Sequence, residues 1–234
     1  MQRLEPWHGH CRLQFTTNDG GRTRHQGGCR APFKLLRAEA GDDGRCELPL
    51  LHTAGGLVGG DQLSIDLNLK AESRSLITSV AAQKVYGSVG RSRLNPDGAW
   101  SRQGVTCTLD DNSDLEWLPQ EMVLYADALF HQSLRVCLPE NASFLSAEIV
   151  RLGRTAAEER LNQGCWRSCL EIQRHGADSP RWELVDRLEL GGSSLTDCHG
   201  LAGAPVFGSL VWAAPKPLSP EAISMLLKDA RDDR

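Results

Sequence analysis

Long apolar runs are absent from this sequence of 234 residues. A membrane-spanning helix needs about 20 consecutive, mainly apolar residues, and no stretch of the chain approaches that length. The N-terminal segment MQRLEPWHGHCRL also lacks the apolar core of a secretory signal peptide. We therefore expect a protein that neither crosses a membrane nor is secreted, and that resides in the cytoplasm.

The chain also lacks a strong charge of either sign. Its formal net charge is -4 and is spread along the sequence, so nothing favours a surface for nucleic acid or for anionic membranes. The eight cysteines include no C-x-x-C pair. In a chain of this length without a signal peptide, such cysteines fit reduced thiols in a core better than a disulfide framework.

Motifs for nucleotide binding and for nucleophilic catalysis are missing as well. The sequence contains no G-x-x-x-x-G-K-[ST], and GGLVGG at 55–60 does not have the G-x-G-x-x-G order. Phosphate-binding loops lead into a helix, whereas these glycines lead into an alternating segment. No G-x-S-x-G occurs, and the seven histidines are scattered. The sequence thus gives no positive sign of an enzyme.

What the sequence does contain is apolar–polar alternation. In residues 62–69, four apolar side chains alternate with polar ones, which predicts a strand with one buried face. We count roughly a dozen strand-like segments at about 10-residue spacing, the signature of an all-β fold. A sandwich, a barrel and a β-helix-like stack all fit this pattern. The clearest segments are 11–15, 62–69, 75–80, 105–109, 130–138, 143–152, 166–174 and 182–190.

One helix is predicted near the C-terminus, within residues 219–234. Ser219 is a candidate N-cap and is followed by Pro220, which suits the first helical position. Ile223, Leu226 and Leu227 then follow at helical spacing. No Pro/Ser-rich linker and no repeat divides the chain, so residues 1–234 are predicted to form a single domain.

The segment HTAGGLVGGD at 52–61 is rich in glycine. The pairs Gly55-Gly56 and Gly59-Gly60 flank an apolar dipeptide, which predicts backbone that bends sharply or that another segment approaches closely. Asp61 lies at the junction between these glycines and the predicted strand. We interpret the four glycines as a structural motif that sets a tight bend beneath a partner surface.

No cluster of metal ligands stands out. His8, His10 and Cys11 could offer nitrogen and sulfur to nickel, copper or zinc. Because no further ligand lies close in the sequence, a solvated strand edge is the favoured interpretation. Isolated carboxylates are more interesting, although each alone fits a turn cap or a surface ion pair. They are Asp61, Glu116, Glu121, Glu159 and Asp186.

Three stretches of the chain together resemble the urease accessory protein family UreD, which is called UreH in some bacteria. They are HTAGGLVGGD (52–61), AAQKVYGS (81–88) and LEWLPQEMVLYADA (115–128), and a weaker match runs from Leu152 through Glu159 to Leu190. The resemblance implies an all-β fold of mainly antiparallel strands or stacked β-sheets, β-helix-like, with one or two short helices near the C-terminus. Relatives usually continue into a basic, aromatic tail, which implies a truncated helical end at 219–234.

The same resemblance implies a function without catalysis. Such a protein acts with UreF and the GTPase UreG as a chaperone that supports nickel insertion into the urease apoprotein, and UreE supplies the nickel. It implies no tightly bound cofactor, only transient Ni²⁺ that crosses a water-filled passage. Two functions from other classes stay open: a free-standing β-sheet module that binds a carbohydrate, and a hydrolase with dispersed active-site residues.

A passage for Ni²⁺ must hold the ion weakly. Clusters of thiolate and imidazole ligands would retain nickel, which stands high in the affinity order. Spaced carboxylates and waters bind less tightly and let the ion move on, as in conducting pores. We therefore hypothesise that Asp61 and Glu159, which both match the family pattern, line such a passage and contact nickel transiently.

Overall fold

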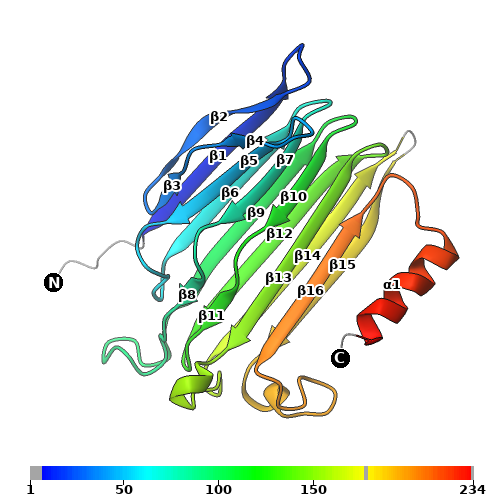
Figure 1. Ribbon diagram of the computed structural model, residues 1–234. Helices are drawn as coiled ribbons and strands as arrows, with labels where there is room; N and C mark the ends of the chain where they lie inside the picture. The colour runs from blue at the N-terminus through cyan, green and yellow to red at the C-terminus, as the bar shows by residue number, and fades with distance from the viewer. Residues whose placement is uncertain (1–6, 177–178, 233–234) are drawn as a thin grey trace.

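The structure is a computed structural model that describes residues 7–176 and 179–232, and it consists almost entirely of two β-sheets (Figure 1). Sheet A has seven strands, in the order β15 (Pro180–Leu190), β14 (Cys165–His175), β12 (Leu129–Pro139), β9 (Ser101–Leu109), β6 (Gln62–Leu69), β1 (His8–Thr17) and β2 (Thr23–Arg30).

Sheet B has nine strands. Its order is β3 (Phe33–Leu35), β5 (Cys46–His52), β7 (Arg74–Ser79), β10 (Asp114–Leu118), β13 (Ser143–Leu152), β11 (Met122–Leu124) and β8 (Gln83–Val85). Two further strands pair at the sides, β4 (Glu39–Ala40) with β5 and β16 (Val206–Ala213) with β13.

The chain alternates between the two sheets as it proceeds. From β5 it crosses to β6 in sheet A, returns to β7 and β8 in sheet B, and repeats this path through β9, β12 and β14. Each return adds a strand that runs in the same direction as the one before it, so the interior strands pair parallel. Among the strands that the structure describes, each antiparallel pair includes a strand at the side of a sheet, namely β2, β3, β4, β15 or β16.

The all-β, β-helix-like prediction is therefore confirmed, but the expectation of mainly antiparallel strands is wrong. Alternation tells which face of a strand is buried and says nothing about the direction of its neighbour. The direction is set instead by connections that cross between the sheets rather than turning back as hairpins.

The hydrophobic core lies between the inner faces of the two sheets. In β6 the four apolar residues of the alternating pattern are all buried, and they pack in one cluster with side chains from both sheets. Phe15, Phe130 and Phe144 are fully buried in the same cluster. The assignment of residues 1–234 to one domain stays a prediction.

Helix α1 (Pro220–Asp232) starts where the sequence predicts it. Ser219 Oγ accepts a hydrogen bond from the Ala222 backbone N–H at 3.2 Å, and Pro220 is the first helical residue. Two short 3-10 turns are also present, η1 (Thr155–Ala157) and η2 (Gly192–Leu195). Among the described residues, no helix combines the length and apolarity that crossing a membrane requires. The last two residues of the predicted helical end, 233 and 234, lie outside the described residues.

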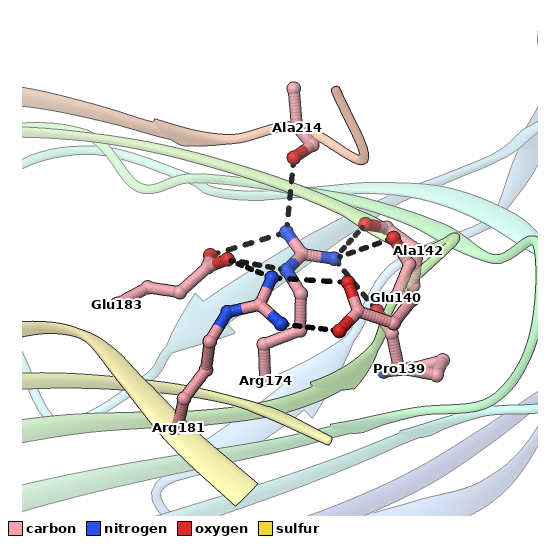
Figure 2. A network of polar contacts seen from close by, with 7 residues as sticks. All are labelled: Pro139, Glu140, Ala142, Arg174, Arg181, Glu183 and Ala214. Carbon is pink, nitrogen blue, oxygen red and sulfur yellow. Dashed lines mark hydrogen bonds and ion pairs between the residues drawn. The ribbon is translucent and has the colours of Figure 1, made fainter. Parts of the chain in front are cut away.

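A buried arginine fastens the two sheets at one end (Figure 2). Arg174 of β14 is 1% exposed, and its Nε and Nη2 donate to the Glu183 carboxylate of β15 at 2.6 and 3.2 Å. Its remaining donors reach backbone carbonyls of Pro139, Glu140, Ala142 and Ala214. A buried charge is tolerated when it is paired and hydrogen-bonded. This guanidinium therefore links β14 and β15 to the turn before β13 and to the segment after β16.

Candidate functional site

Sheet B is interrupted in its middle. β13 pairs with β10 through residues 143–146 and with β11 through residues 150–152, which leaves residues 147–149 without a partner on that side. The adjacent strands of sheet B are interrupted at the same level. One interruption separates β7 from β8, and the other separates β10 from β11. Pro119 lies in the second break, where its missing N–H could not extend a ladder. Ala81 lies in the first, with φ of +66°.

A cavity of about 380 Å³ lies between the sheets behind this interruption. One end is bounded by Phe33, His52 and the bend at 80–84. The other end reaches β14 and β16, where Ser168 and Ser209 line it. The cavity thus runs across the strands of both sheets and meets the outer face of sheet B where the ladder is broken.

The three stretches that carry the family resemblance meet around this cavity. They are far apart in the sequence, but each contributes lining residues. These are His52, Gly55 and Gly56 from the first stretch, Ala81, Ala82, Gln83 and Lys84 from the second, and Trp117, Pro119, Gln120 and Met122 from the third. The breaks in the sheet and the most recognisable parts of the sequence therefore coincide.

A polar row crosses the inner face of sheet A at the cavity. Gln103, Gln132 and Ser168 occupy matched register positions on β9, β12 and β14, and all three line the cavity. Gln132 Nε2 donates to Ser168 Oγ at 3.2 Å and also to the carboxylate of Glu148 on β13. The contact between Gln132 and Glu148 joins the two sheets across the space between them.

Among the described residues, Glu148 is the one carboxylate that lines the cavity. Burial raises the pKa of Glu148, and the hydrogen bond from Gln132 opposes this rise without cancelling it. No cation in the described part of the chain pairs with this carboxylate, so water or a bound cation could stabilise its charged form. Sequence reasoning missed Glu148, although alternation in 143–152 places it on the same face as Phe144 and Val150.

The comparisons with known proteins identify the family. A family model described as "UreD urease accessory protein" matches residues 8–233. The chain belongs to the UreD family. It is 78% identical over 234 residues to the urease accessory protein UreD of Parasynechococcus marenigrum strain WH8102, covering 100% of this chain and 75% of that protein. It is 68% identical to UreD of Synechococcus sp. strain CC9605, with the same coverage, and 56% identical to UreD of Prochlorococcus marinus strain MIT 9303, covering 98% and 79%.

In this UreD family member, Asp61 closes the turn that contains the second glycine pair. Its carboxylate accepts a hydrogen bond from the Val58 backbone N–H at 2.9 Å, and its own N–H donates to the Val58 carbonyl at 3.1 Å. Asp61 is not among the residues that line the cavity, but it acts on one that does. Burial lowers the pKa of His52, and the charge of Asp61 opposes that shift.

The four glycines of the UreD-like stretch meet two different needs. Gly55 and Gly60 have φ of +76° and +100°, a region that favours glycine. Gly56 also has a positive φ, of +154°, and like Gly59 it allows close approach: a Cβ on Gly59 would lie 2.2 Å from Ser88 Oγ. This glycine segment therefore fits closely against the stretch 81–88.

Glu159 lies in an ion pair rather than in the cavity lining. Arg154 donates to both of its carboxylate oxygens, through Nε at 2.7 Å and through Nη2. These hydrogen bonds hold the pKa of Glu159 below its usual value. The Arg154 guanidinium also lies 4.3 Å from the centroid of the Tyr125 ring. The structure does not bring Asp61 and Glu159 together in the cavity, and their role in a nickel passage stays a prediction.

The N-terminal histidines bond to neighbouring strand residues. The ring Nε2 atoms of His8 and His10 lie 2.8 Å from Ser64 Oγ and 3.0 Å from an Asp66 carboxylate oxygen. Cys11 points to the opposite face of β1 and is buried in the core. Within residues 7–176 and 179–232, no group of three or more His, Cys, Asp or Glu side chains is placed to hold a metal ion.

Proposed function

We propose that this UreD family member serves in urease maturation as a scaffold without catalytic activity, and that its cavity forms part of the route by which Ni²⁺ reaches the urease apoprotein. Family membership supports the role in urease maturation. The convergence of the three family-like stretches on one cavity supports the second part.

The chemistry of the cavity suits an ion in transit. Its polar lining includes a carboxylate, amides and hydroxyls, from Glu148, Gln132, Gln103, Ser168 and Ser209. It also includes a single imidazole, a single thiol and one ammonium group, from His52, Cys169 and Lys84. Oxygen ligands that are few and spaced hold Ni²⁺ more weakly than a cluster of imidazoles or thiolates would. A volume of about 380 Å³ accommodates on the order of ten water molecules, so a hydrated ion fits.

The route extends beyond the cavity in this proposal. Asp61, near His52, and Glu159, held by Arg154, provide carboxylates outside the lining. Nickel supplied by UreE enters in a complex that contains UreF and UreG, and the ion leaves toward the urease apoprotein. The complex assembles in the cytoplasm, and nickel is transient cargo in it.

The test measures nickel in urease separately from complex assembly. We would express Glu148→Gln, Glu148→Leu, Asp61→Ala and Glu159→Ala variants together with urease and the other accessory proteins. Each variant is assayed for urease activity, for nickel per urease, and for co-purification with UreF and UreG. Glu39, an exposed carboxylate on β4, supplies the matched control Glu39→Gln.

The expected result is that the Glu148 variants assemble normally but deliver less nickel, with Glu148→Leu more severe than Glu148→Gln. Normal nickel content in all four variants would overturn the route. Failure of the wild-type chain to associate with any urease maturation component would overturn the scaffold as well.

A further inference from the structure

Two cysteines face each other across the hairpin at one side of sheet A. β1 and β2 pair antiparallel, and Cys11 lies directly opposite Cys29. Directly opposed residues of such a pair project to the same face of the sheet. Cys11 is fully buried, Cys29 is partly buried against the same core, and both thiols are free. The two sulfur atoms are therefore neighbours on the inner side of the hairpin.

The turn of the hairpin determines whether Cys11 and Cys29 form a hydrogen-bonded or a non-hydrogen-bonded pair of the ladder. The Asn18 N–H donates to the Arg22 carbonyl at 3.0 Å, which makes these two residues a hydrogen-bonded pair. Hydrogen-bonded and non-hydrogen-bonded pairs then alternate along the strands. Thr17 and Thr23 form the next pair, non-hydrogen-bonded, with hydroxyls 3.2 Å apart.

The register continues without a shift from that threonine pair to Cys11 and Cys29. Every second pair along the ladder is of the same kind, so the cysteines also form a non-hydrogen-bonded pair. Cα atoms at such positions lie about 4.5 Å apart. That separation falls within the range of about 4.4–6.8 Å that a disulfide spans. Backbone geometry therefore permits a bond between the two sulfurs.

We propose that Cys29 and Cys11 form a thiol modification site that takes a low-molecular-weight disulfide, such as oxidised glutathione, and ends as a cross-strand disulfide. The Cys29 thiolate attacks one sulfur of the small disulfide, forms a mixed disulfide and releases one small thiolate. Cys11 then attacks Cys29 Sγ, and its proton passes to the departing small thiolate. This step forms the protein disulfide and releases the second small molecule as a thiol. Two protein thiols are oxidised, and the small disulfide is reduced to two thiols.

The order of these steps follows from access. Cys29 is only partly buried, so a small disulfide can reach it first. Cys11 has no exposed surface, so it reacts only with a sulfur already beside it. Burial raises the pKa of its thiol to about 12, which keeps its thiolate scarce and makes the second step the slower one.

The modification would change a contact of a residue at one end of the cavity. The Cys29 thiol donates a hydrogen bond to the Phe33 carbonyl at 3.2 Å. Phe33 lines the cavity and packs edge-on against His52, with ring centroids 6.2 Å apart. Oxidation removes the thiol hydrogen, so the Phe33 carbonyl loses this hydrogen bond when the disulfide forms, while the pairing of β3 with β5 remains.

The test maps disulfides in the full chain. The reduced protein is incubated with oxidised glutathione, its free thiols are alkylated, and tryptic peptides are analysed by mass spectrometry. We expect a disulfide between the peptides 4–12 and 25–30, which contain Cys11 and Cys29. Cys11→Ala should instead retain glutathione on Cys29. The double variant Cys165→Ser/Cys169→Ser, which leaves this hairpin unchanged, should keep the linked peptides.

Three results would overturn the proposal. In the wild-type chain, Cys29 could remain fully alkylatable, it could carry glutathione without forming the link to Cys11, or it could link to another cysteine. The wild-type result alone decides among them, so the proposal remains testable even when Cys11→Ala does not fold. None of these measurements involves nickel or urease, and their outcome is independent of the proposed function.

Discussion

Gln132 and Glu148 connect the two sheets by a hydrogen bond from an amide nitrogen to a carboxylate across the cavity. The same amide nitrogen donates to Ser168, so Gln132 is fixed by neighbours in both sheets. This arrangement orients an otherwise unpaired carboxylate in an enclosed space. It also makes the stability of the fold sensitive to both side chains.

Replacement of Gln132 by leucine should destabilise the protein by about 1–3 kcal/mol, because the buried carboxylate of Glu148 loses its donor. The free energy of unfolding, measured by urea denaturation at pH 7.5, checks this. The double variant Gln132→Leu/Glu148→Leu should recover much of the loss, since it leaves no carboxylate without a partner. Equal destabilisation by the single and double variants would show that the hydrogen bond is unimportant.

The pH dependence of stability should reveal the raised pKa of Glu148. A carboxyl group whose pKa is higher in the folded state binds protons more tightly there, so ionisation opposes folding. The penalty is absent below the ordinary pKa of 4.5, grows as pH rises from 4.5 to the raised value, and is constant above it. Glu148→Gln should therefore be more stable than the wild type at neutral pH, and the advantage should vanish in acid. A constant difference at every pH would contradict this prediction.

Much of the fold could be predicted from alternation. The strand expected at 143–152 coincides with β13, and the one expected at 62–69 with β6. Strands β2 and β16 were not predicted, because only Thr23 in the first and Ala213 in the second are buried. A strand with little buried surface carries little alternation for sequence reasoning to detect.

The candidate site was harder to predict for a physical reason. The cavity exists because three segments lie at the same level of sheet B. They are the break after β7 at Ala81, the break after β10 at Pro119, and the part of β13 around Glu148 that lacks a partner on that side. Their alignment depends on parallel register between segments far apart in the chain, which no local pattern encodes. The position of Asp61 at the junction of the glycine pairs and a strand predicts a place in the passage, whereas in the structure Asp61 closes a turn outside the cavity lining.

Replacement of Gly59 by valine should reduce the yield of soluble protein. A Cβ at this position would lie 2.2 Å from Ser88 Oγ and 2.8 Å from the Ala99 carbonyl oxygen, so the two segments must separate. Overpacking of this kind destabilises by about 1–3 kcal/mol. Gly28→Val on β2 is the matched control, because nothing lies within 4 Å of its Cβ position. Soluble fraction and thermal midpoint would be compared, and equal behaviour of the two variants would refute the close-approach explanation.

The Arg174–Glu183 pair should be among the most sensitive positions in the protein. Glu183→Gln removes the countercharge of a guanidinium that is 1% exposed, whereas the Glu183 side chain itself keeps 25% of its surface exposed. Breaking a fully buried pair destabilises by about 3–5 kcal/mol. Because Glu183 is partly exposed and the backbone carbonyls around Arg174 remain, we expect a loss below that range, of about 1–3 kcal/mol. Glu140→Gln is the control, because it breaks the exposed ion pair with Arg181 in the same network and should have only a small effect (Figure 2). Urea denaturation of both variants decides the matter: similar losses would mean that burial of Arg174 does not set the strength of its pairing.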